Sequence, residues 1–171
     1  MNTKGEAWKR HFPTATSGAH LFPEFEMRAK AVSGEVFRVP DAAEARETLL
    51  RLVDGVGAKK AVVVESPLQE AAGITEALRS RGITVYTEPA DIAAHAETAD
   101  IGISGVEFGV AETGSVFQDG GAIATRLVTI LPPLHVVFLP GANIFPGITE
   151  AFELISQSFD RGYVGFITGP S

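Results

Sequence analysis

The segment Ala61-Val-Val-Val-Glu-Ser-Pro-Leu-Gln69 joins a short apolar run to the start signal of a helix. An apolar run with no polar alternation is typical of a strand that is covered on both faces. Ser66 then supplies an N-cap, Pro67 suits the first helical position, and Gln69 completes a capping box. The segment therefore predicts a buried strand that is followed directly by a helix.

The same alternation of strand and helix extends to both sides of this segment. Upstream, a strand is predicted over Val36–Val39, and the capping box Asp41–Glu44 begins a helix that ends at Gly55 or Gly57. Downstream, a helix that runs to Ser80 and ends at Gly82 is followed by strands over Ile83–Tyr86 and Ala99–Ser104. This rhythm predicts parallel strands that are joined by right-handed crossovers.

The rhythm changes after Gly105. Strands over Ser115–Gln118 and Val136–Leu139 are separated by short connections, which suggests an added antiparallel element. A helix from Ile148 to Phe159 and a last strand over Gly165–Thr168 follow. The predicted fold class is α/β, with a Rossmann-like, mostly parallel sheet flanked by helices.

Residues 1–33 differ from the rest of the chain and are predicted to form an irregular N-terminal arm, followed by one domain over 34–171. The arm carries aromatic side chains between prolines and small polar residues. These aromatics either cover an apolar face of the same protein or dock on a partner. The first interpretation is favoured, because exposed aromatic surface is costly unless an interface covers it.

Composition excludes several classes of function. The net charge is -7 and no basic cluster is present, which argues against non-specific nucleic-acid binding. The 171 residues contain no cysteine, so thiolate ligands for zinc or iron–sulfur clusters are excluded within them. The four histidines are scattered, which argues against a His-rich metal site.

The location of the protein is predicted from two absences in the sequence. Met1–Arg10 is polar and lacks the apolar core of a signal peptide. No apolar run approaches the roughly 20 residues of a membrane-spanning helix. We therefore expect a cytoplasmic protein.

The stretch Gly102–Val116 is the strongest candidate for a functional site, because it combines four glycines with two carboxylates. Ligands of parallel sheets bind beyond the carboxyl ends of the strands, where this stretch is predicted to emerge. Its glycines allow backbone N–H groups to converge on an anion, and Glu112 is suited to accept a proton or hydrogen bond from a substrate hydroxyl. From the residues alone, a tight turn at Thr113-Gly114 explains the same pattern.

Two further residues are candidates for ligand binding. Arg126 ends the small-residue stretch Gly120–Arg126, which is predicted to be a loop that closes over a carboxylate or phosphate. Ser171 follows a predicted strand in Thr168-Gly-Pro-Ser171 and is expected at the same sheet edge.

Three ordered blocks of the sequence carry a family resemblance: Ala99–Ser115 with its Ala-Glu-Thr-Gly turn, Leu131–Phe138, and Phe166–Ser171. Together they resemble the lactate-utilisation (LUD) domain family, in its small single-domain branch, that of lactate utilisation protein C. Glu107 stands where the family pattern usually has Asp. The pattern also continues beyond Ser171 into an acidic stretch, so we expect the C-terminal end of the domain to be incomplete here.

The resemblance implies a fold like that of the ribose-phosphate isomerase, glucosamine-phosphate deaminase and CoA-transferase group. It implies a subunit of a system that oxidises L-lactate to pyruvate, with iron–sulfur clusters in Cys-rich partner subunits and no cofactor in this chain. A small hydroxy- or keto-acid would bind at the Ala-Glu-Thr-Gly turn. The predicted catalytic residues are Glu112 and Thr113, and the predicted ligand-binding residues are Gly105, Glu107, Gly114, Ser115, Arg126 and Ser171.

Two other functions remain open at this point. One is a stand-alone isomerase or transferase that acts on a phosphorylated sugar or an acyl-CoA. The other is a purely structural subunit, in which the Ala-Glu-Thr-Gly segment is a turn with no ligand.

Overall fold

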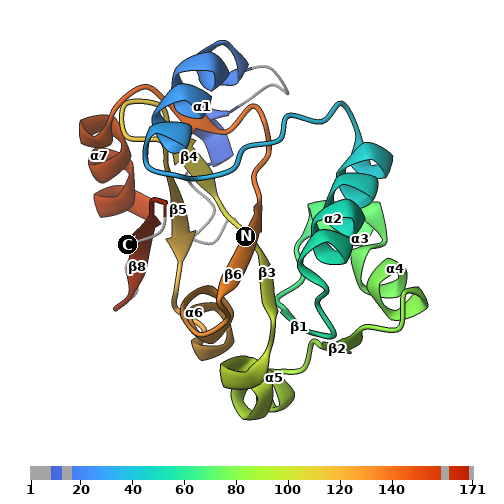
Figure 1. Cartoon of the computed structure of the whole chain (residues 1–171). Coiled ribbons are helices and arrows are strands. Elements are labelled where there is room, and N and C mark those ends of the chain that lie inside the picture. Colours follow the sequence, from blue (N-terminus) through green and yellow to red (C-terminus); the bar gives the residue numbers. More distant parts are fainter. Residues whose placement is uncertain (1–8, 13–16, 159–161, 170–171) are drawn as a thin grey trace. The chain divides into compact units, whose positions relative to one another are not determined.

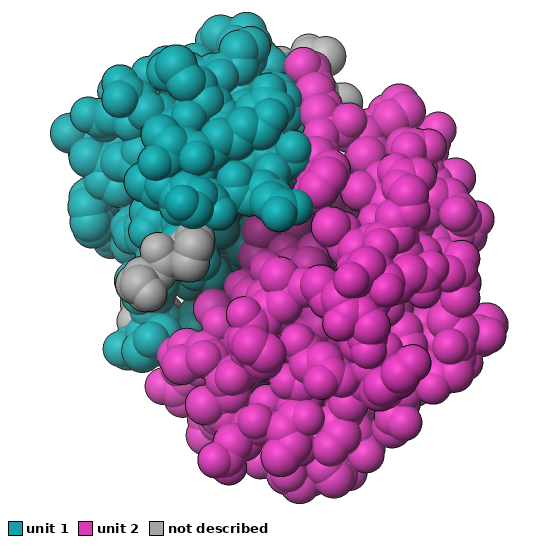
Figure 2. Space-filling model, viewed as in Figure 1, with its two compact units in different colours: residues 1–36, 106–121, 139–171 teal, residues 37–105, 122–138 magenta. Residues whose placement is uncertain are grey.

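The computed structural model of the chain describes residues 9–12, 17–158 and 162–169 (Figure 1). Ser171 therefore lies outside the described residues, as does Trp8 of the predicted arm. The chain divides into two compact units (Figure 2). Unit 1 comprises residues 1–36, 106–121 and 139–171, and unit 2 comprises residues 37–105 and 122–138.

Unit 2 is built around a parallel sheet with the strand order β2-β1-β3-β6. Its strands are β1 (Lys60–Val63), β2 (Thr84–Tyr86), β3 (Ile101–Gly105) and β6 (Leu134–Phe138). Its helices are α2 (Ala42–Val56), α3 (Pro67–Ala72), α4 (Ile74–Ser80), α5 (Pro89–His95), the 3-10 turn η3 (Ala96–Thr98) and α6 (Ile123–Ile130). The predicted α/β class with a parallel sheet flanked by helices is confirmed.

Both faces of this sheet are covered, because its strands send apolar side chains to either side. One face packs Val63 and Ile103 against α2 and α4, and the other packs Val62 against Ile92 of α5 and Val128 of α6. Fully apolar strands of this kind are stable only between two layers of helices. The predicted start of α2 is also confirmed, since Asp41 Oδ1 accepts the Glu44 N–H at 2.9 Å.

Unit 1 contains a mixed sheet with the strand order β7-β4-β5-β8. Its strands are β4 (Phe108–Val110), β5 (Ser115–Asp119), β7 (Ile144–Phe145) and β8 (Val164–Ile167), and its helical elements are η2 (Ala19–Leu21), α1 (Phe22–Ala31) and α7 (Ile148–Ser158). β5 runs antiparallel to both β4 and β8, whereas β7 runs parallel to β4. Of the two strands on which the predicted antiparallel element was based, only Ser115–Gln118 lies in this sheet, as part of β5.

Two helices of unit 1 contact its sheet through alternating residues of β4. Phe108 and Val110 belong to the apolar cluster that includes Leu154 of α7. Gly109, between them, approaches Phe25 of α1 so closely that an added Cβ would lie 2.9 Å from its ring. Because successive side chains of a strand point to opposite faces, α1 and α7 cover opposite faces of this sheet.

The aromatics of the predicted arm cover apolar surface of their own unit. Phe22 and Phe25 are buried in α1, and the ring of Phe12 meets that of Phe145 edge-on, with 4.8 Å between centroids. The first of the two interpretations of the arm is thus supported by these residues. Helix α1 is the regular element of this part of the chain.

Two of the predicted elements are wrong. Val36–Val39 forms no strand, since it pairs with none of the described strands, and Phe37 is 51% exposed. β-branched and aromatic residues favour a strand only where a neighbour supplies the ladder of hydrogen bonds. The single helix predicted to run to Ser80 is divided at Gly73, whose φ of 61° ends α3 and begins α4.

Helices α5 and α6 were not predicted from the sequence. Because α6 lies between β5 and β6 in the chain, β6 returns parallel to β3 in unit 2 and is not part of the antiparallel element. The stretch before Arg126 was predicted to be a loop from its small residues. That prediction is wrong, because Ala124 and Leu127 pack beneath the sheet of unit 2 at helical spacing, which places Arg126 on α6.

Gly114→Ala is expected to destabilise the protein strongly. Gly114 has a φ of 66°, and an added Cβ would lie 2.6 Å from the carbonyl carbon of Arg28 in α1. Backbone strain and overpacking should together lower the free energy of unfolding by about 3 kcal/mol. The measurement is denaturant unfolding followed by circular dichroism.

Gly57→Ala is the matched control for the backbone strain alone. Gly57 has a φ of 65°, but no atom lies within 4 Å of its added Cβ. Its substitution should therefore cost only about 1 kcal/mol. Equal losses at the two positions would contradict the claim that α1 packs tightly on the turn.

Candidate functional site

The Ala-Glu-Thr-Gly segment is the turn of a β-hairpin in unit 1. It joins β4 to β5, whose residues Val110 and Ser115 pair across the turn. The Gly114 N–H donates to the Val110 carbonyl at 2.9 Å, which closes the turn. The turn that the residues alone suggested is therefore present, and it lies against α1.

Glu112 is exposed, and its carboxylate caps helix α7. Its Oε2 accepts the backbone N–H of Ile148, the first residue of α7, at 2.9 Å. The positive end of the helix dipole and an otherwise unpaired N–H both favour a carboxylate there. The hairpin thus presents this side chain at the surface.

Thr113 and Ser115 bind each other within the turn. The Ser115 hydroxyl donates to Thr113 Oγ1 at 2.7 Å, and the Ser115 N–H approaches the same oxygen at 3.3 Å. The N–H groups of Gly114 and Ser115 thus already donate inside the hairpin. An anion bound at this turn would have to compete with these hydrogen bonds.

Glu107 stabilises the opposite end of the same hairpin. Its Oε2 accepts the Asp119 N–H at 2.9 Å, and its carbonyl oxygen accepts from the Asn143 side chain at 3.0 Å. A single residue thus joins β5 to the segment before β7. Glu107, which stands where the family pattern usually has Asp, is therefore held by the backbone of Asp119.

The structure groups five of the predicted site residues in unit 1, all on or beside the β4–β5 hairpin: Glu107, Glu112, Thr113, Gly114 and Ser115. Gly105 and Arg126 belong to unit 2, where Gly105 ends β3 and Arg126 lies on α6. Thus α6, and not a flexible loop, carries the candidate arginine.

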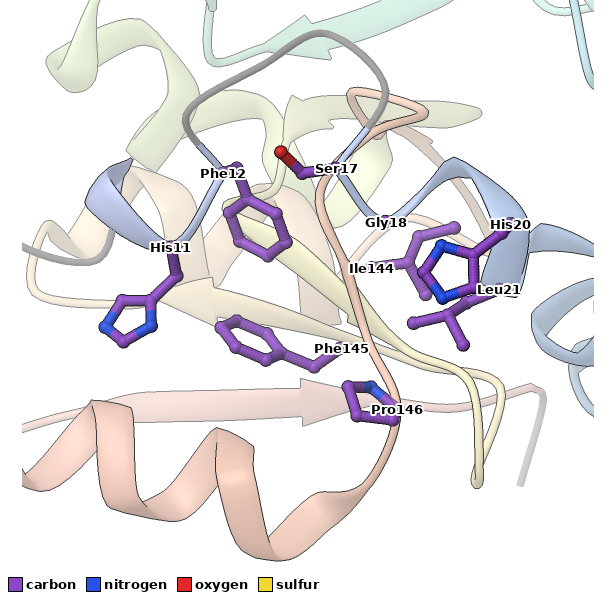
Figure 3. A pocket seen from close by; sticks show the side chains of 9 residues that line it. All are labelled: His11, Phe12, Ser17, Gly18, His20, Leu21, Ile144, Phe145 and Pro146. Atoms are coloured by element: carbon purple, nitrogen blue, oxygen red, sulfur yellow. The ribbon is translucent and has the colours of Figure 1, made fainter.

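A cavity of about 280 Å³ lies in unit 1 beside β7 (Figure 3). Its walls come from the segment before α1 and from β7 with the residue that follows it. The lining residues are His11, Phe12, Ser17, Gly18, His20, Leu21, Ile144, Phe145 and Pro146. Two imidazoles and a hydroxyl therefore share this cavity with apolar side chains.

The hairpin turn fixes one wall of this cavity. The Ala111 N–H donates to the Phe145 carbonyl at 2.8 Å, and the Glu112 N–H donates to the Pro146 carbonyl at 3.0 Å. On the other side, the Gly18 N–H donates to the Ala142 carbonyl at 2.7 Å. The predicted motif is thus connected to the cavity through the backbone.

The sequence analysis gave no role to His11 and His20. They are nine positions apart, and no metal-binding or catalytic spacing links them to each other or to the hairpin. They reach one cavity only because the segment 17–21 docks on β7. An added Cβ at Gly18 would lie 2.6 Å from the Ala142 carbonyl oxygen, so this docking depends on glycine.

A serine and a histidine meet on the sheet of unit 2. Ser104 Oγ of β3 and His135 Nε2 of β6 are 2.9 Å apart. Such a pair resembles an activated nucleophile, but Ser104 is completely buried and so is withheld from solvent. Burial also lowers the pKa of His135 to about 4, so the ring is neutral at neutral pH.

The capping box predicted at the start of α3 does not form. Ser66 Oγ and both amide atoms of Gln69 are buried without a hydrogen-bond partner, and the side chain of Ser66 makes no capping bond. An added Cβ at Gly105 would lie 2.9 Å from Ser66 Oγ. The end of β3 therefore lies directly against this hydroxyl.

The described residues hold neither a metal-binding cluster of side chains nor a membrane-spanning helix. Within residues 9–12, 17–158 and 162–169, no group of three or more His, Asp or Glu side chains is arranged to hold a metal ion. None of the helices in that part of the chain has the length and apolar character needed to cross a membrane.

Residues 22–171 match the sequence model of the LUD domain. The chain belongs to the LUD-domain family. This LUD domain is 29% identical over 133 residues to a protein named lactate utilization protein C from Anoxybacillus flavithermus, which covers 77% of the chain and 60% of that protein. A protein of the same name from a Geobacillus strain is 29% identical over 143 residues, covering 76% and 59%. The chain thus spans about three fifths of the length of these relatives.

A solved structure shares the fold of this LUD domain. The crystal structure of a DUF162 family protein from Deinococcus radiodurans superimposes with a TM-score of 0.64 over 90% of this chain and 89% of that one. The two sequences are 19% identical. The similarity therefore concerns the fold.

Glu112→Ala in the LUD domain should weaken the capping of α7, whereas Glu112→Gln should largely preserve it. The amide oxygen of Gln can still accept the Ile148 N–H, but Ala leaves that donor unpaired. We expect Ala to lower the free energy of unfolding by about 1 kcal/mol and Gln by about half as much or less. Thermal unfolding checks this, and an unchanged stability in the Ala variant would contradict the capping role.

His135 should make the LUD domain less stable in acid. Its pKa is lowered to about 4 from 6.5, so the unfolded chain binds the additional proton between these values. As pH falls from 6.5 to 4, this residue should remove at most about 3 kcal/mol from the free energy of unfolding. Below pH 4 its contribution should stay constant.

The measurement compares urea unfolding of the wild type and His135→Asn across this pH range. The variant lacks the titrating ring, so the difference in stability between the two proteins should shrink or reverse in acid. A difference that does not change with pH would show that His135 does not couple folding to protonation.

Proposed function

We propose that this LUD domain is a component of a cytoplasmic system that oxidises L-lactate to pyruvate. The match of residues 22–171 to the LUD domain, together with relatives that are named lactate utilization protein C, carries this proposal. The role in lactate utilisation is proposed for this chain, because the chain spans about three fifths of the length of those relatives.

The composition of the chain suggests which subunit of such a system holds the electron acceptor. Oxidation of L-lactate to pyruvate releases two electrons and two protons, and the electrons need an acceptor. The 171 residues contain no cysteine that could hold an iron–sulfur cluster through thiolate. We therefore assign the clusters, and with them the electron acceptor, to Cys-rich partner subunits.

Within this proposal, the Ala-Glu-Thr-Gly turn binds a small acid or a partner surface. One oxygen of Glu112 caps α7. The exposed position of this carboxylate supports a second role for its other oxygen, as acceptor or base toward the substrate hydroxyl. Thr113, in the same turn of unit 1, contributes to this site in the proposal.

A structural subunit is the second candidate, and the hydrogen bonds of the hairpin favour it. Thr113, Gly114 and Ser115 bind groups of their own turn, and Glu112 binds the start of α7. A turn of this kind stabilises unit 1 without any ligand. An isomerase or transferase of phosphorylated sugars or acyl-CoA rests only on fold class, which does not determine an activity.

Growth on L-lactate tests both candidates. Deletion of the gene should abolish growth on L-lactate and preserve growth on pyruvate, because only the oxidation step is lost. Complementation then uses the wild type, Glu112→Gln and the control Glu153→Gln, which changes another exposed carboxylate of α7. We expect Glu112→Gln to reduce the rate of lactate oxidation in cell extracts by about tenfold or more, and Glu153→Gln to leave it unchanged.

The outcomes separate the alternatives. Normal growth of the deletion strain on L-lactate would overturn the proposed function. Normal lactate oxidation by a stably produced Glu112→Gln variant would overturn the role of Glu112 as a base and leave the structural subunit. Failure of the deletion strain on pyruvate would place the defect after lactate oxidation and would also contradict the proposal.

A further inference from the structure

The cavity of unit 1 combines hydrogen-bonding and apolar surfaces. Figure 3 shows the rings of Phe12 and Phe145 close together, with the imidazoles of His11 and His20 on opposite sides of them in this view. Ile144 and Leu21 lie beside His20. The lining therefore has hydrogen-bonding rings near its ends and hydrocarbon between them.

The size of the cavity restricts its ligand. At about 280 Å³ it is close to the lower limit of roughly 300 Å³ for pockets that hold drug-sized molecules. The cavity therefore has room for a small molecule such as a three-carbon acid.

The lining also indicates the chemistry of the ligand. An imidazole donates an N–H in both its neutral and charged states, and the neutral ring offers an acceptor nitrogen as well. A carboxylate accepts such a donor, and a hydroxyl group can donate to the acceptor nitrogen. Among the described residues that line the cavity there is no Asp or Glu to repel an anion.

We propose that this cavity binds the anion of a small hydroxy- or keto-acid. The carboxylate accepts an N–H from His11 or His20, and the short carbon chain lies against Ile144 and Phe145. The identity of the acid rests on the proposed function, whereas the location of its site rests on the cavity.

The same geometry gives Glu112 a positioning role. Its N–H holds the Pro146 carbonyl at 3.0 Å, and its carboxylate holds the Ile148 N–H at 2.9 Å. Pro146 lines the cavity and Glu112 does not, so an acid bound here gives Glu112 this positioning role in place of the proposed role as base. The Ala-Glu-Thr-Gly motif therefore supports the site through the backbone of the segment that follows β7.

Isothermal titration of the full chain tests the site. The probes are L-lactate and pyruvate, with L-lactamide as an uncharged ligand of nearly the same shape. The variants are His11→Gln, His20→Gln and the double variant. His95→Gln is the matched control, because His95 stacks on Tyr86 in unit 2 with 4.0 Å between ring centroids.

We expect the wild type and His95→Gln to bind L-lactate or pyruvate equally well, and L-lactamide about tenfold more weakly or worse. At least one single variant and the double variant should lose about tenfold or more in affinity, since a charge-assisted hydrogen bond is removed. No binding by the wild type, equal binding of L-lactamide, or unchanged affinity in the double variant would each overturn the proposal.

Nuclear magnetic resonance of the wild type keeps the test independent of whether the variants fold. The ring signals of His11 and His20 should shift during titration with L-lactate, and those of His95 and His135 should not. Shifts confined to His95 or His135 would overturn the proposal. If the chain binds L-lactate but the deletion strain grows normally on it, the proposed function is overturned and the site is retained. If growth on L-lactate needs the gene but the chain does not bind the acid, the site is overturned and the proposed function is retained.

Discussion

Three hydrogen bonds from two adjacent residues organise unit 1. The N–H groups of Ala111 and Glu112 bind the carbonyls of Phe145 and Pro146, and the Glu112 carboxylate binds the N–H of Ile148. These bonds continue the β4–β7 pairing beyond the strands and start α7 at a defined place. The apolar cluster beneath α7 and the wall of the cavity both depend on that placement. One hairpin turn thereby connects the sheet, a helix and the candidate site.

Unit 2 depends on glycines that let other elements approach β3. An added Cβ at Gly102 would collide with the Val128 carbonyl of α6, and one at Gly105 would lie 2.7 Å from the Cβ of Ser66. The sequence analysis attributed this glycine-rich stretch to ligand binding. In the structure, both glycines have a packing function that is independent of any ligand. The glycines of this stretch therefore allow close packing on β3, whether or not the stretch also binds a ligand.

Several elements were predictable because their signals are local. The N-cap at Asp41 and the apolar run of β1 act through neighbours in sequence, and both were identified correctly, while Gly57 was one of the two glycines expected to end α2. The elements that were missed depend on distant contacts. Helix α6 buries Val128 against Val62 across the sheet, and Val36–Val39 fails as a strand for lack of a partner. Propensity alone does not contain this information.

The candidate site shows the same division. The sequence by itself determined that a tight turn at Thr113-Gly114 was one of two explanations of the motif, because turn chemistry depends on adjacent residues. Only the tertiary structure decided that Glu112 caps α7 and that His11 and His20 share a cavity with Phe145. Those contacts join residues far apart in the chain, and they form only when burial of the aromatic cluster outweighs the entropy of ordering the intervening segments.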